Sequence, residues 1–525
     1  MSAWQSFTLS EVQNQGRRKF LKQTLDSGFA LGTGLASSYF MSGCSSLDRA
    51  ILGGAPKGPN EVVILGAGLA GLTTAYLCKK NGIPFSLYEG SSRVGGRVLT
   101  LREFNRASQS ADLGGEWISP QHQTLISLAK ELNVELSSSP FKESDFLFFE
   151  GAKKVNSQKL LAEIRTFQKK STEIYRQIFY NQVNQLRAAN RGEFRAAVDQ
   201  DRVSCEELIH NLTAKSSEIL PLLLQRQIEL SYGAHPSKVS SLIWLRQLQE
   251  PNEFSILGAT TQLRVSGGSS VLTQALFDRV SGVIPGRFVN LSHKLVSVAQ
   301  DSGGFEIRFE TPQGVKTVQA NRVVSTLPIS VFRKIKGVES LSLTDFAHEA
   351  LMTASTGEQA KGLLSFTERP WKRLHAIRRF SGTWGSQNFW ESEPRGLKWQ
   401  AGSDFSQRSI LCFQLGGEMA AKAGLHSVDG ALQDLASLGM ASGYEDLSQI
   451  QNWSLSPWSL GGRSYSSPGQ VAAFGGSLAE PQCHGQWQFA GEATSLQWQG
   501  TMNGAVESAF NAFKNLVKND FQKRS

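Results

Sequence analysis

The chain has 525 residues, of which 40% are hydrophobic and 19% charged, and its formal net charge is +9. This is the composition of a globular protein with room for two or three domains, and the mild positive charge does not require an anionic partner. Five cysteines without a CxxC pair and eight scattered histidines argue against a disulfide framework and against a metal site.

The first 44 residues have the pattern of a targeting segment and are set apart from the fold. Arg17 and Arg18 precede Phe20, and a weakly apolar stretch rich in Gly, Ala and Ser ends at Cys44 in the sequence MSGC. The pattern resembles a twin-arginine (Tat) export signal that closes on a lipobox, although two arginines alone would be only a basic tail. It implies passage through the Tat translocase to the periplasm or cell envelope, and lipidation of Cys44 would tether the protein to a membrane. Residues 45–60 form a linker that contains Gly and Pro.

A nucleotide-binding unit begins with VVILGAGLAGL at residues 62–72. An apolar strand enters a GxGxxG turn and a helix leaves it near Leu69. The first glycine permits the turn, the second admits a pyrophosphate, and the third lets the helix pack closely on the strand. The helix N-terminus attracts phosphate, and an acidic residue about twenty positions further on can bond ribose hydroxyls. The residues expected to hold a dinucleotide here are Gly66, Gly68, Leu69, Ala70, Gly71 and Glu89.

A second glycine pair follows at once in EGSSRVGGRV, which brings Arg93, Gly95, Gly96 and Arg97 toward the same pyrophosphate. Together the two motifs resemble the extended flavin-binding signature of the flavin amine oxidase family. That family contains monoamine, polyamine, putrescine and L-amino-acid oxidases and related desaturases. An exported enzyme also cannot rely on a soluble nicotinamide pool. The sequence therefore predicts that the dinucleotide is FAD, bound and retained.

The resemblance continues along most of the chain. The loop DLGGEWISP resembles the segment beside the flavin ring, KLVSV resembles the strand against the adenine, and FAGEATSLQWQGTMNGAVESA resembles the C-terminal flavin motif. A helix that begins near Asn503 would direct its N-terminus at the flavin N1–C2 region, where negative charge accumulates on reduction. The resemblance assigns cofactor contacts to Gly114, Gly115, Glu116, Trp117, Leu295, Gly491, Glu492, Thr501 and Met502.

The hydrophobic pattern divides the remaining sequence into regions. Helical periodicity dominates about residues 155–250, strands separated by turns return over about 265–330, and a mixed, Trp-rich region covers about 340–455. We expect an α/β protein with a discontinuous, Rossmann-like FAD-binding domain and a mixed α+β substrate domain that carries a helical insertion. The expected FAD-binding domain comprises residues 61–140, 255–330 and 455–525. The substrate domain then comprises 141–254 and 331–454, with the active site at the interface.

Lys361 is the candidate catalytic residue. It lies in KGLLSF, ahead of Pro370 and Trp371, where the resemblance implies a lysine that holds a water near the flavin N5. Some relatives bind FAD covalently through a cysteine, but LGGRSY has Arg463 at that position, so non-covalent FAD is expected. The two tyrosines that face the flavin in monoamine oxidases are replaced by Ser464 and Thr501. The candidate pocket residues are Trp458, Arg463, Tyr465 and Trp498, and a buried core position is an equal alternative for each aromatic one.

These features predict an FAD-dependent amine oxidase. It would convert an amine to an imine, and then to an aldehyde and ammonia or a smaller amine, while oxygen is reduced to hydrogen peroxide. The loop DLGGEWISP lacks the arginine that pairs with the substrate carboxylate in L-amino-acid oxidases. Its Glu116 would favour a cationic substrate, and a helix-capping or solvent-facing glutamate is the alternative.

Three alternatives stay open. The first is an L-amino-acid oxidase that uses Arg463. The second is a flavin desaturase or dehydrogenase that passes its electrons to another carrier. The third is a non-catalytic, FAD-bound factor. The basic, aromatic stretch 371–384 suits a half-exposed strand pair better than a nucleic-acid contact, because an exported flavoenzyme meets little nucleic acid.

Overall fold

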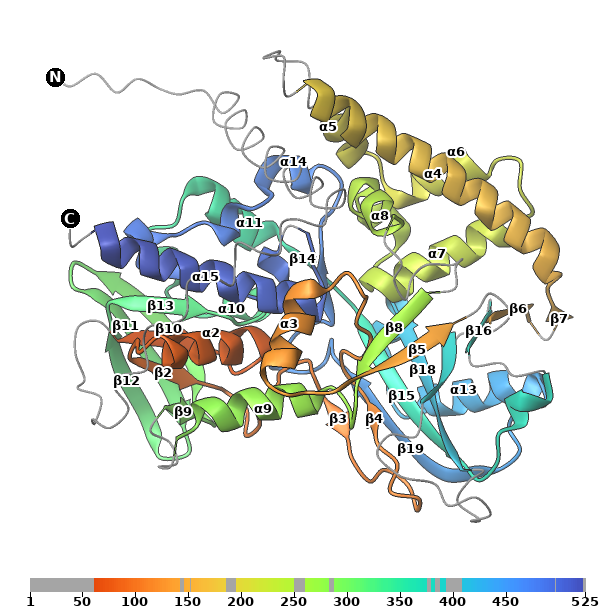
Figure 1. Ribbon diagram of the computed structural model, residues 1–525, viewed down its shortest axis with the longest axis horizontal. Coiled ribbons are helices and arrows are strands. Elements are labelled where there is room, and N and C mark those ends of the chain that lie inside the picture. The colour runs from red at the N-terminus through yellow and green to blue at the C-terminus, as the bar shows by residue number, and fades with distance from the viewer. Residues whose placement is uncertain are drawn as a thin grey trace.

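The computed structural model describes residues 61–141, 146–151, 153–185, 195–249, 260–282, 288–374, 379–382, 388–392, 408–495 and 497–522. The export signal, Cys44 and the linker therefore lie outside the described residues. The described chain has two halves, each built on its own β-sheet, with a group of helices above the second (Figure 1).

The first half is built on a five-stranded parallel sheet in the order β21-β13-β1-β2-β9. Strand β1 is central, with Val62 opposite Arg322 on one side and Phe85 on the other. Three separated stretches of the chain thus meet in one sheet, as the predicted discontinuous domain requires. The strands are β1 (Val62–Leu65), β2 (Phe85–Tyr88), β9 (Val289–Asn290), β13 (Arg322–Ser325) and β21 (Trp487–Phe489).

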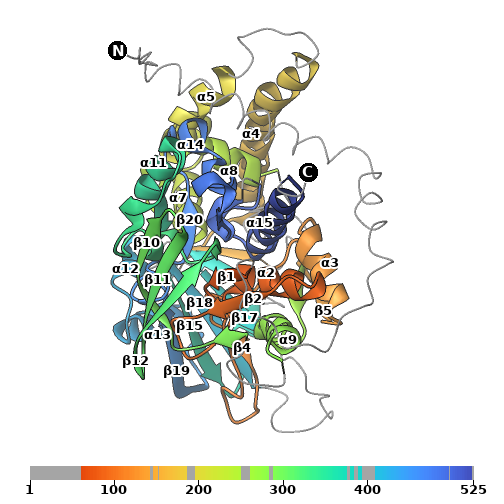
Figure 2. The same ribbon diagram turned by 90° about the vertical axis from the view of Figure 1, so that its left-hand side faces the viewer.

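Alternate residues of β1 face opposite layers, as the two-residue period of a strand requires. Val62 and Ile64 pack with helices on one face, and Val63 and Leu65 pack with a three-stranded antiparallel sheet on the other. Figure 2 shows this arrangement from the side, with the parallel sheet between the two layers. The helices are α2 (Leu69–Lys80), α9 (Ser270–Val280) and α15 (Met502–Gln522), and the antiparallel strands are β10 (Lys294–Asp301), β11 (Gly304–Thr311) and β12 (Gly314–Ala320).

The second half is built on a seven-stranded sheet in the order β19-β15-β18-β17-β16-β6-β7, antiparallel except where β16 pairs with β6. Helix α13 (His426–Ser437) packs on it, and Val428, Ala431 and Leu435 join its apolar cluster. The strands are β6 (Phe146–Glu150), β7 (Lys153–Lys154), β15 (Gln359–Phe366), β16 (Arg379–Gly382), β17 (Asn388–Ser392), β18 (Ser409–Gly416) and β19 (Tyr444–Asn452).

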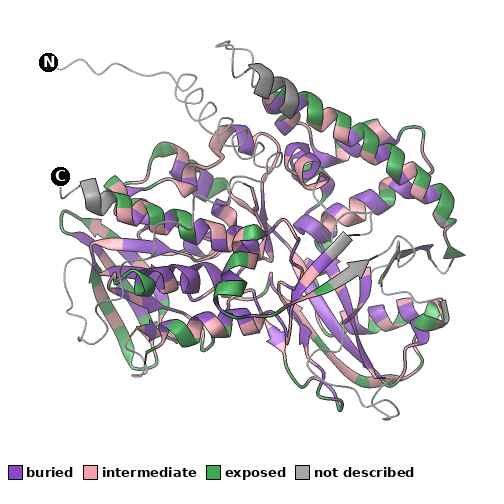
Figure 3. Cartoon of the chain, in the orientation of Figure 1, coloured by how far each residue is buried: buried purple, intermediate pink, exposed green. Residues whose placement is uncertain are grey.

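The region of helical periodicity folds into helices that cover one end of this sheet (Figure 1). Helix α6 begins with a capping box, in which the Ser204 side chain and the Glu207 backbone and carboxylate bond reciprocally. Burial is concentrated in the sheets and on the inner faces of the helices, and the outer face of α4 is largely exposed (Figure 3). These helices are α4 (Ser157–Gln185), α5 (Arg195–Arg202), α6 (Cys205–Thr213), α7 (Ile219–Tyr232) and α8 (Ser241–Gln247).

Shorter elements complete the described chain. Strand β5 pairs with β8 and β14 pairs with β20, and helix α3 follows the DLGGEWISP loop. Helix α11 packs with Trp487 and Phe489 in the first half, although the sequence assigned its residues to the substrate domain. The bounds are β3 (Thr100–Leu101), β4 (Ala111–Asp112), α3 (Gln123–Glu131), β5 (Leu136–Phe141), β8 (Thr260–Val265), α10 (Ile329–Phe332), α11 (Asp345–Thr353), β14 (Ser355–Gly357), α12 (Glu418–Ala421), β20 (Arg463–Tyr465) and α14 (Gln470–Phe474).

The predicted α/β class, with a parallel nucleotide-binding sheet and a helical insertion, is confirmed. Helix α2 begins at Leu69 as expected, and the C-terminal helix begins at Met502, one residue before the expected Asn503. Within the described ranges, we find no helix both long and apolar enough to cross a bilayer, and no group of side chains able to hold a metal ion.

Candidate active site

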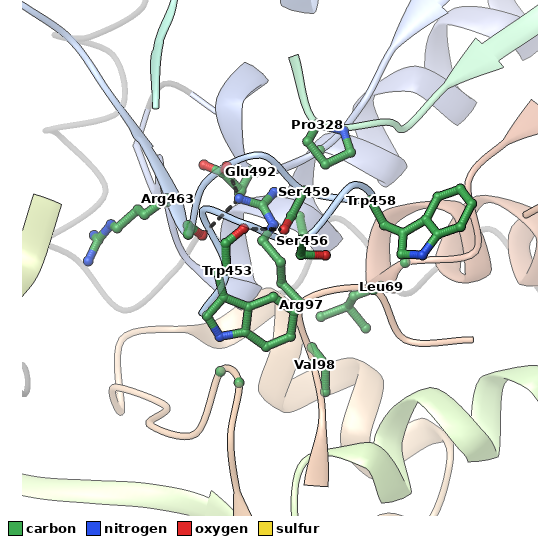
Figure 4. A pocket seen from close by; sticks show the side chains of 18 of the residues that line it. Leu69, Arg97, Val98, Pro328, Trp453, Ser456, Trp458, Ser459, Arg463 and Glu492 are labelled. Atoms are coloured by element: carbon green, nitrogen blue, oxygen red, sulfur yellow. Dashed lines mark hydrogen bonds and ion pairs between the residues drawn. The ribbon is translucent and has the colours of Figure 1, made fainter. Parts of the chain in front are cut away.

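A cavity of about 1030 Å³ lies between the two halves. Its wall includes nearly every residue that the sequence singled out, and Figure 4 shows part of it around Arg97 and Glu492. Gly71 and Tyr465 are not on this wall. The predicted residues that do line the cavity are Gly66, Gly68, Leu69, Ala70, Glu89, Arg93, Gly95, Gly96, Arg97, Gly114, Gly115, Glu116, Trp117, Leu295, Lys361, Trp458, Arg463, Gly491, Glu492, Trp498, Thr501 and Met502.

The two glycine motifs lie against each other at the start of α2. The Gly95 N–H donates to the Ala67 carbonyl at 2.8 Å, and a Cβ on Gly96 would lie 3.3 Å from the Gly68 Cα. Gly71 lies on α2 and lets this helix pack closely on the turn, because a Cβ there would lie only 1.9 Å from the carbonyl oxygen of Gly66. The pair of loops is therefore open enough for a pyrophosphate to approach two backbones and one helix N-terminus.

Two carboxylates lie at the end of the cavity where the two glycine motifs meet. Glu89 follows β2 and is held by the Ala67 N–H at 2.7 Å and by the backbone and hydroxyl of Ser91. Glu492 accepts from Arg97 Nη1 at 2.8 Å through Oε1, while its buried Oε2 has no hydrogen-bond partner among the described residues. A buried carboxylate oxygen without a donor is costly, and a ligand hydroxyl would satisfy it. The glycine cradle and this oxygen fit FAD.

The N-terminus of α15 reaches the same cavity. The Thr501 hydroxyl caps it by accepting from the Gly504 N–H at 3.0 Å. A Cβ on Gly115 would lie 3.1 Å from the Met502 side chain, so the DLGGEWISP loop packs directly on this helix start. The loop and the C-terminal motif, far apart in the sequence, therefore present glycine backbone and a helix N-terminus side by side, where both can contact the flavin ring.

Glu116 and Lys361 form a buried ion pair on the cavity wall. Lys361 Nζ lies 2.6 Å from Glu116 Oε2, and the indole N–H of Trp390 donates to the same oxygen at 3.2 Å. The second oxygen, Oε1, lies 3.3 Å from Arg264 Nη1, and the Arg264 guanidinium stacks 3.6 Å from the centre of the Trp117 ring. We call Lys361, Glu116 and Arg264 the buried triad.

The buried triad changes the interpretation of Glu116. Its carboxylate lies between the Lys361 ammonium and the Arg264 guanidinium, and its side chain is 2% exposed. The negative charge of Glu116 is therefore already neutralised and is not available to bind a cationic substrate. Sequence reasoning missed Arg264. It lies in β8, next to Leu263, which pairs with Ile118 two residues after Glu116. Only that pairing brings the arginine to the loop.

The sheet of the second half presents a polar row to the cavity beside Lys361. Lys361 on β15 is opposite Gln414 on β18, which is opposite Asn388 on β17, and all three line the cavity. Residues directly opposite in antiparallel strands project to the same face. Helix α7 closes this end, because the carbonyl of Leu230 accepts from the side-chain amides of Gln414 at 3.2 Å and Gln359 at 2.7 Å.

The candidate pocket residues do not gather in one place. Trp458 contacts Gly90, directly after Glu89, and Figure 4 shows it beside Pro328 and Leu69 while Arg463 points the other way. Trp458 therefore belongs to the nucleotide end of the cavity. Tyr465 lines a separate cavity of about 100 Å³. Its side chain packs in the apolar cluster of the helical insertion.

Arg463 and Trp498 do reach the large cavity, together with two residues that sequence reasoning missed. Arg463 donates to the carbonyls of Ser231 at 3.2 Å and Gln499 at 3.3 Å. Trp498 meets His122 edge to face, with ring centres 4.9 Å apart. Burial and the charge of Arg463 lower the pKa of His122 to about 3, so this imidazole is neutral. Trp453 also lines the cavity, and its indole N–H donates to the Leu113 carbonyl.

Comparisons with known proteins agree with this geometry. The model of the family "Flavin containing amine oxidoreductase" matches residues 69–514. The chain is 25% identical to an L-amino-acid oxidase of Siganus canaliculatus, with 87% of this chain and 85% of the relative covered. It is 24% identical to the flavin-containing amine oxidase B of Sus scrofa, with 87% and 86% covered.

Two solved structures have a similar fold. Cyclohexylamine oxidase from Brevibacterium oxydans aligns with a TM-score of 0.70 at 19% identity, covering 88% of this chain and 99% of that one. Wild-type putrescine oxidase bound to putrescine aligns with a TM-score of 0.68 at 18% identity, covering 87% and 99%. With the matched family model, the glycine cradle and the cavity between the two halves, this chain belongs to the flavin containing amine oxidoreductases and is an FAD-dependent oxidoreductase that acts on amines.

Proposed function

We propose that this enzyme oxidises a small amine that carries one amino group, and that oxygen is the final electron acceptor. Bound FAD would supply the redox chemistry: a hydride equivalent (two electrons and one proton) leaves the carbon that bears nitrogen, the nitrogen loses a second proton, and oxygen takes up the two electrons and two protons to give hydrogen peroxide. The C–N bond of the substrate becomes C=N, and water then hydrolyses this imine to an aldehyde and ammonia. The observation that carries the proposal is the buried triad, which fixes the Lys361 ammonium on the wall of the cavity that the cofactor-binding motifs also line.

The side chains of the cavity have separable tasks in this reaction. Helix α7 and the strand face of β15, β17 and β18 enclose the reaction space and exclude bulk water. Lys361, held by Glu116, can donate hydrogen bonds to a single water without leaving its place. That water would serve imine hydrolysis or the step with oxygen. The amides of Gln414 and Asn388 lie beside it on the same face and orient polar groups of the substrate.

The charges of the cavity favour a monoamine over a diamine or polyamine. A second ammonium group needs a carboxylate to replace its hydration. Among the described residues that line the cavity, the carboxylates are Glu89, Glu116 and Glu492. Glu116 is held between two cations, Glu492 pairs with Arg97, and Glu89 is bonded to the glycine-rich turn and Ser91. No carboxylate at the substrate end is left for a distal ammonium within that set.

An L-amino acid is the second candidate, and arginines favour it. Arg226, Arg246 and Arg463 line the cavity, and the relative from Siganus canaliculatus is named an L-amino-acid oxidase. Arg463 donates to backbone carbonyls, and a guanidinium can add a bidentate pair with a carboxylate. If Arg463 holds the substrate carboxylate, Arg463→Ala should raise the KM for amino acids at least tenfold. An unchanged KM would remove Arg463 from that role.

The deciding experiment is an anaerobic titration of the purified holoenzyme, followed by the visible absorbance of the flavin. Monoamines, diamines, polyamines and L-amino acids are added in turn, and the donor that bleaches the flavin identifies the substrate class. We expect bleaching by monoamines and little by putrescine. Bleaching by none of them would refute the proposal and revive the non-catalytic factor. Bleaching without peroxide formation on admission of air would identify the desaturase or dehydrogenase alternative.

We also propose that FAD is bound without a covalent link. Cys78, Cys205, Cys412 and Cys483 are buried, and none of these four lines the cavity. Acid precipitation of the holoenzyme should release all of the yellow colour into the supernatant. Flavin that stays with the pellet would contradict the proposal.

The export proposal rests on residues 1–44 alone. We propose a Tat-exported enzyme of the periplasm or cell envelope that Cys44 tethers to a membrane. Arg17→Lys with Arg18→Lys should keep the enzyme in the cytoplasm, and Cys44→Ala should move it from the membrane fraction to the soluble periplasm. Unchanged fractionation of both variants would refute this assignment.

A further inference from the structure

His122 is a buried side chain on the cavity wall that the reaction described above does not use. It precedes α3, is 7% exposed and lines the cavity. Its ring meets Trp498 edge to face, and α3 packs against α15, with the Leu125 N–H donating to Asn503 at 3.0 Å. The imidazole is therefore held between two rigid elements beside the helix N-terminus that faces the flavin site.

One hydrogen bond decides which ring nitrogen of His122 carries the proton. Nδ1 accepts from the Ser119 backbone N–H at 3.2 Å, so in the neutral ring the proton lies on Nε2. Among the described residues, no hydrogen-bond partner reaches Nε2. The ring stays neutral at physiological pH, because burial and the charge of Arg463 lower its pKa to about 3. The cavity wall therefore carries a fixed, uncharged N–H donor.

A donor of this kind selects an oxygen acceptor. A donor on the cavity wall can be hydrated when no ligand is bound, and a ligand oxygen that replaces the water keeps the N–H satisfied. A substrate ammonium is itself a donor and cannot satisfy it. Two ligands of this cavity carry suitable oxygens: the carbonyl groups of the flavin ring and the carboxylate of an amino acid.

We propose that His122 is a ligand-binding residue whose Nε2–H donates a hydrogen bond to a carbonyl or carboxylate oxygen of the molecule bound in the cavity. If the acceptor is a substrate carboxylate, the inference rests on the second candidate of the proposed function, an L-amino acid; if it is a flavin carbonyl, the inference rests on the family's cofactor. If the acceptor belongs to the substrate, His122 and Arg463 together make this cavity selective for amino acids. If it belongs to the flavin, His122 fixes the ring and leaves substrate choice unchanged.

Two substitutions separate the donor from the local fold. His122→Asn places an amide oxygen where Nδ1 was, so it keeps the bond from the Ser119 N–H and removes the Nε2 donor. His122→Gln places an amide N–H near the former Nε2 and restores the donor. His235→Asn is the matched control, because His235 Nδ1 also accepts a backbone N–H, from Ser237 at 3.3 Å, on an exposed surface outside the cavity.

The first measurement is the affinity of each apoprotein for FAD, from the quenching of flavin fluorescence. The second is the substrate concentration that half-reduces the FAD-saturated enzyme without oxygen, for an amine and for an L-amino acid. Loss of one hydrogen bond weakens binding about three- to tenfold. Weaker FAD binding in His122→Asn, recovered in His122→Gln, identifies the flavin as the acceptor. Weaker binding of the amino acid alone identifies the substrate carboxylate.

If His122→Asn matches the His235→Asn control in both measurements while its melting temperature is unchanged, the proposal is overturned. Equal losses in His122→Asn and His122→Gln also overturn it, because they reflect the ring's packing on Trp498 and not the donor. If no amine or amino acid reduces the wild-type flavin, the proposed function fails. The FAD affinities then test His122 alone, and unchanged affinities reject it.

Discussion

Glu116→Gln should destabilise the protein strongly, because it removes the counter-ion of two buried cations while keeping the side-chain volume. The carboxylate lies 2.6 Å from Lys361 Nζ and 3.3 Å from Arg264 Nη1. Removing one partner from a buried ion pair costs about 3–5 kcal/mol, because the remaining charge stays desolvated. For 525 residues, an unfolding entropy of about 2.1 cal/mol/K per residue makes 1 kcal/mol worth about 1 °C. The expected fall in Tm is therefore about 3–5 °C.

The assay is thermal and denaturant unfolding of the holoenzyme at a fixed excess of FAD, so that ligand linkage is constant. Glu310→Gln is the control, since its ion pair with Lys294 is exposed and should contribute less than about 1 kcal/mol. Adding Lys361→Met to Glu116→Gln removes one of the two stranded cations, so the double variant should lose less stability than the sum of the single variants. Additive losses, or a Glu116→Gln variant as stable as the control, would refute the account of the buried triad.

Three further predictions concern packing and protonation. Gly71→Ala should abolish FAD binding, because its Cβ would lie 1.9 Å from the Gly66 carbonyl oxygen. Gly430→Ala, in open space on α13, should instead stabilise the protein by about 0.5–1 kcal/mol. FAD titration and denaturant unfolding of both variants check these two expectations. Burial raises the pKa of Asp201 to about 6 from 3.8, so the folded protein keeps a proton that the unfolded chain has lost. Wild-type stability relative to Asp201→Asn should fall by roughly 3 kcal/mol as the pH rises from about 4 to 6, and a pH-independent difference in denaturant unfolding would contradict it. The pH dependence of stability from His122 has the opposite direction, because its pKa is lowered in the folded protein to about 3 from its ordinary value of 6.5. The unfolded chain therefore binds a proton that the folded protein does not, and wild-type stability relative to His122→Asn should fall as the pH decreases from 6.5 toward 3. Acid-unfolding midpoints measure this, and identical midpoints would count against it.

Local sequence was sufficient for the nucleotide end of the site. The strand before Gly66, the helix from Leu69 and Glu89 after the next strand follow from hydrophobic runs, glycine spacing and one acidic position, all within thirty residues of the first. The start of the C-terminal helix was expected at Asn503 from the family's C-terminal flavin motif, and the helix begins one residue earlier, at Met502, with Thr501 as its cap. Backbone geometry of this kind depends on neighbouring residues, and the sequence lists those neighbours directly.

The substrate end depended on contacts that no local pattern contains. Glu116 and Lys361 are 245 positions apart, and Arg264 reaches them only because β8 pairs with the loop at Ile118. For that reason an apparently free carboxylate is a neutralised member of the buried triad, and Trp458 lies at the nucleotide end.

The sequence alone therefore determined the strand–turn–helix units that hold the cofactor, because these follow from short-range backbone chemistry, and its motifs resembled those of the family that binds FAD. Only the tertiary structure decided which charges are paired, which aromatic residues face the cavity and which nitrogen of His122 bears its proton. Those properties depend on burial and on distances between residues far apart in the chain, and both exist only once the two halves have packed together.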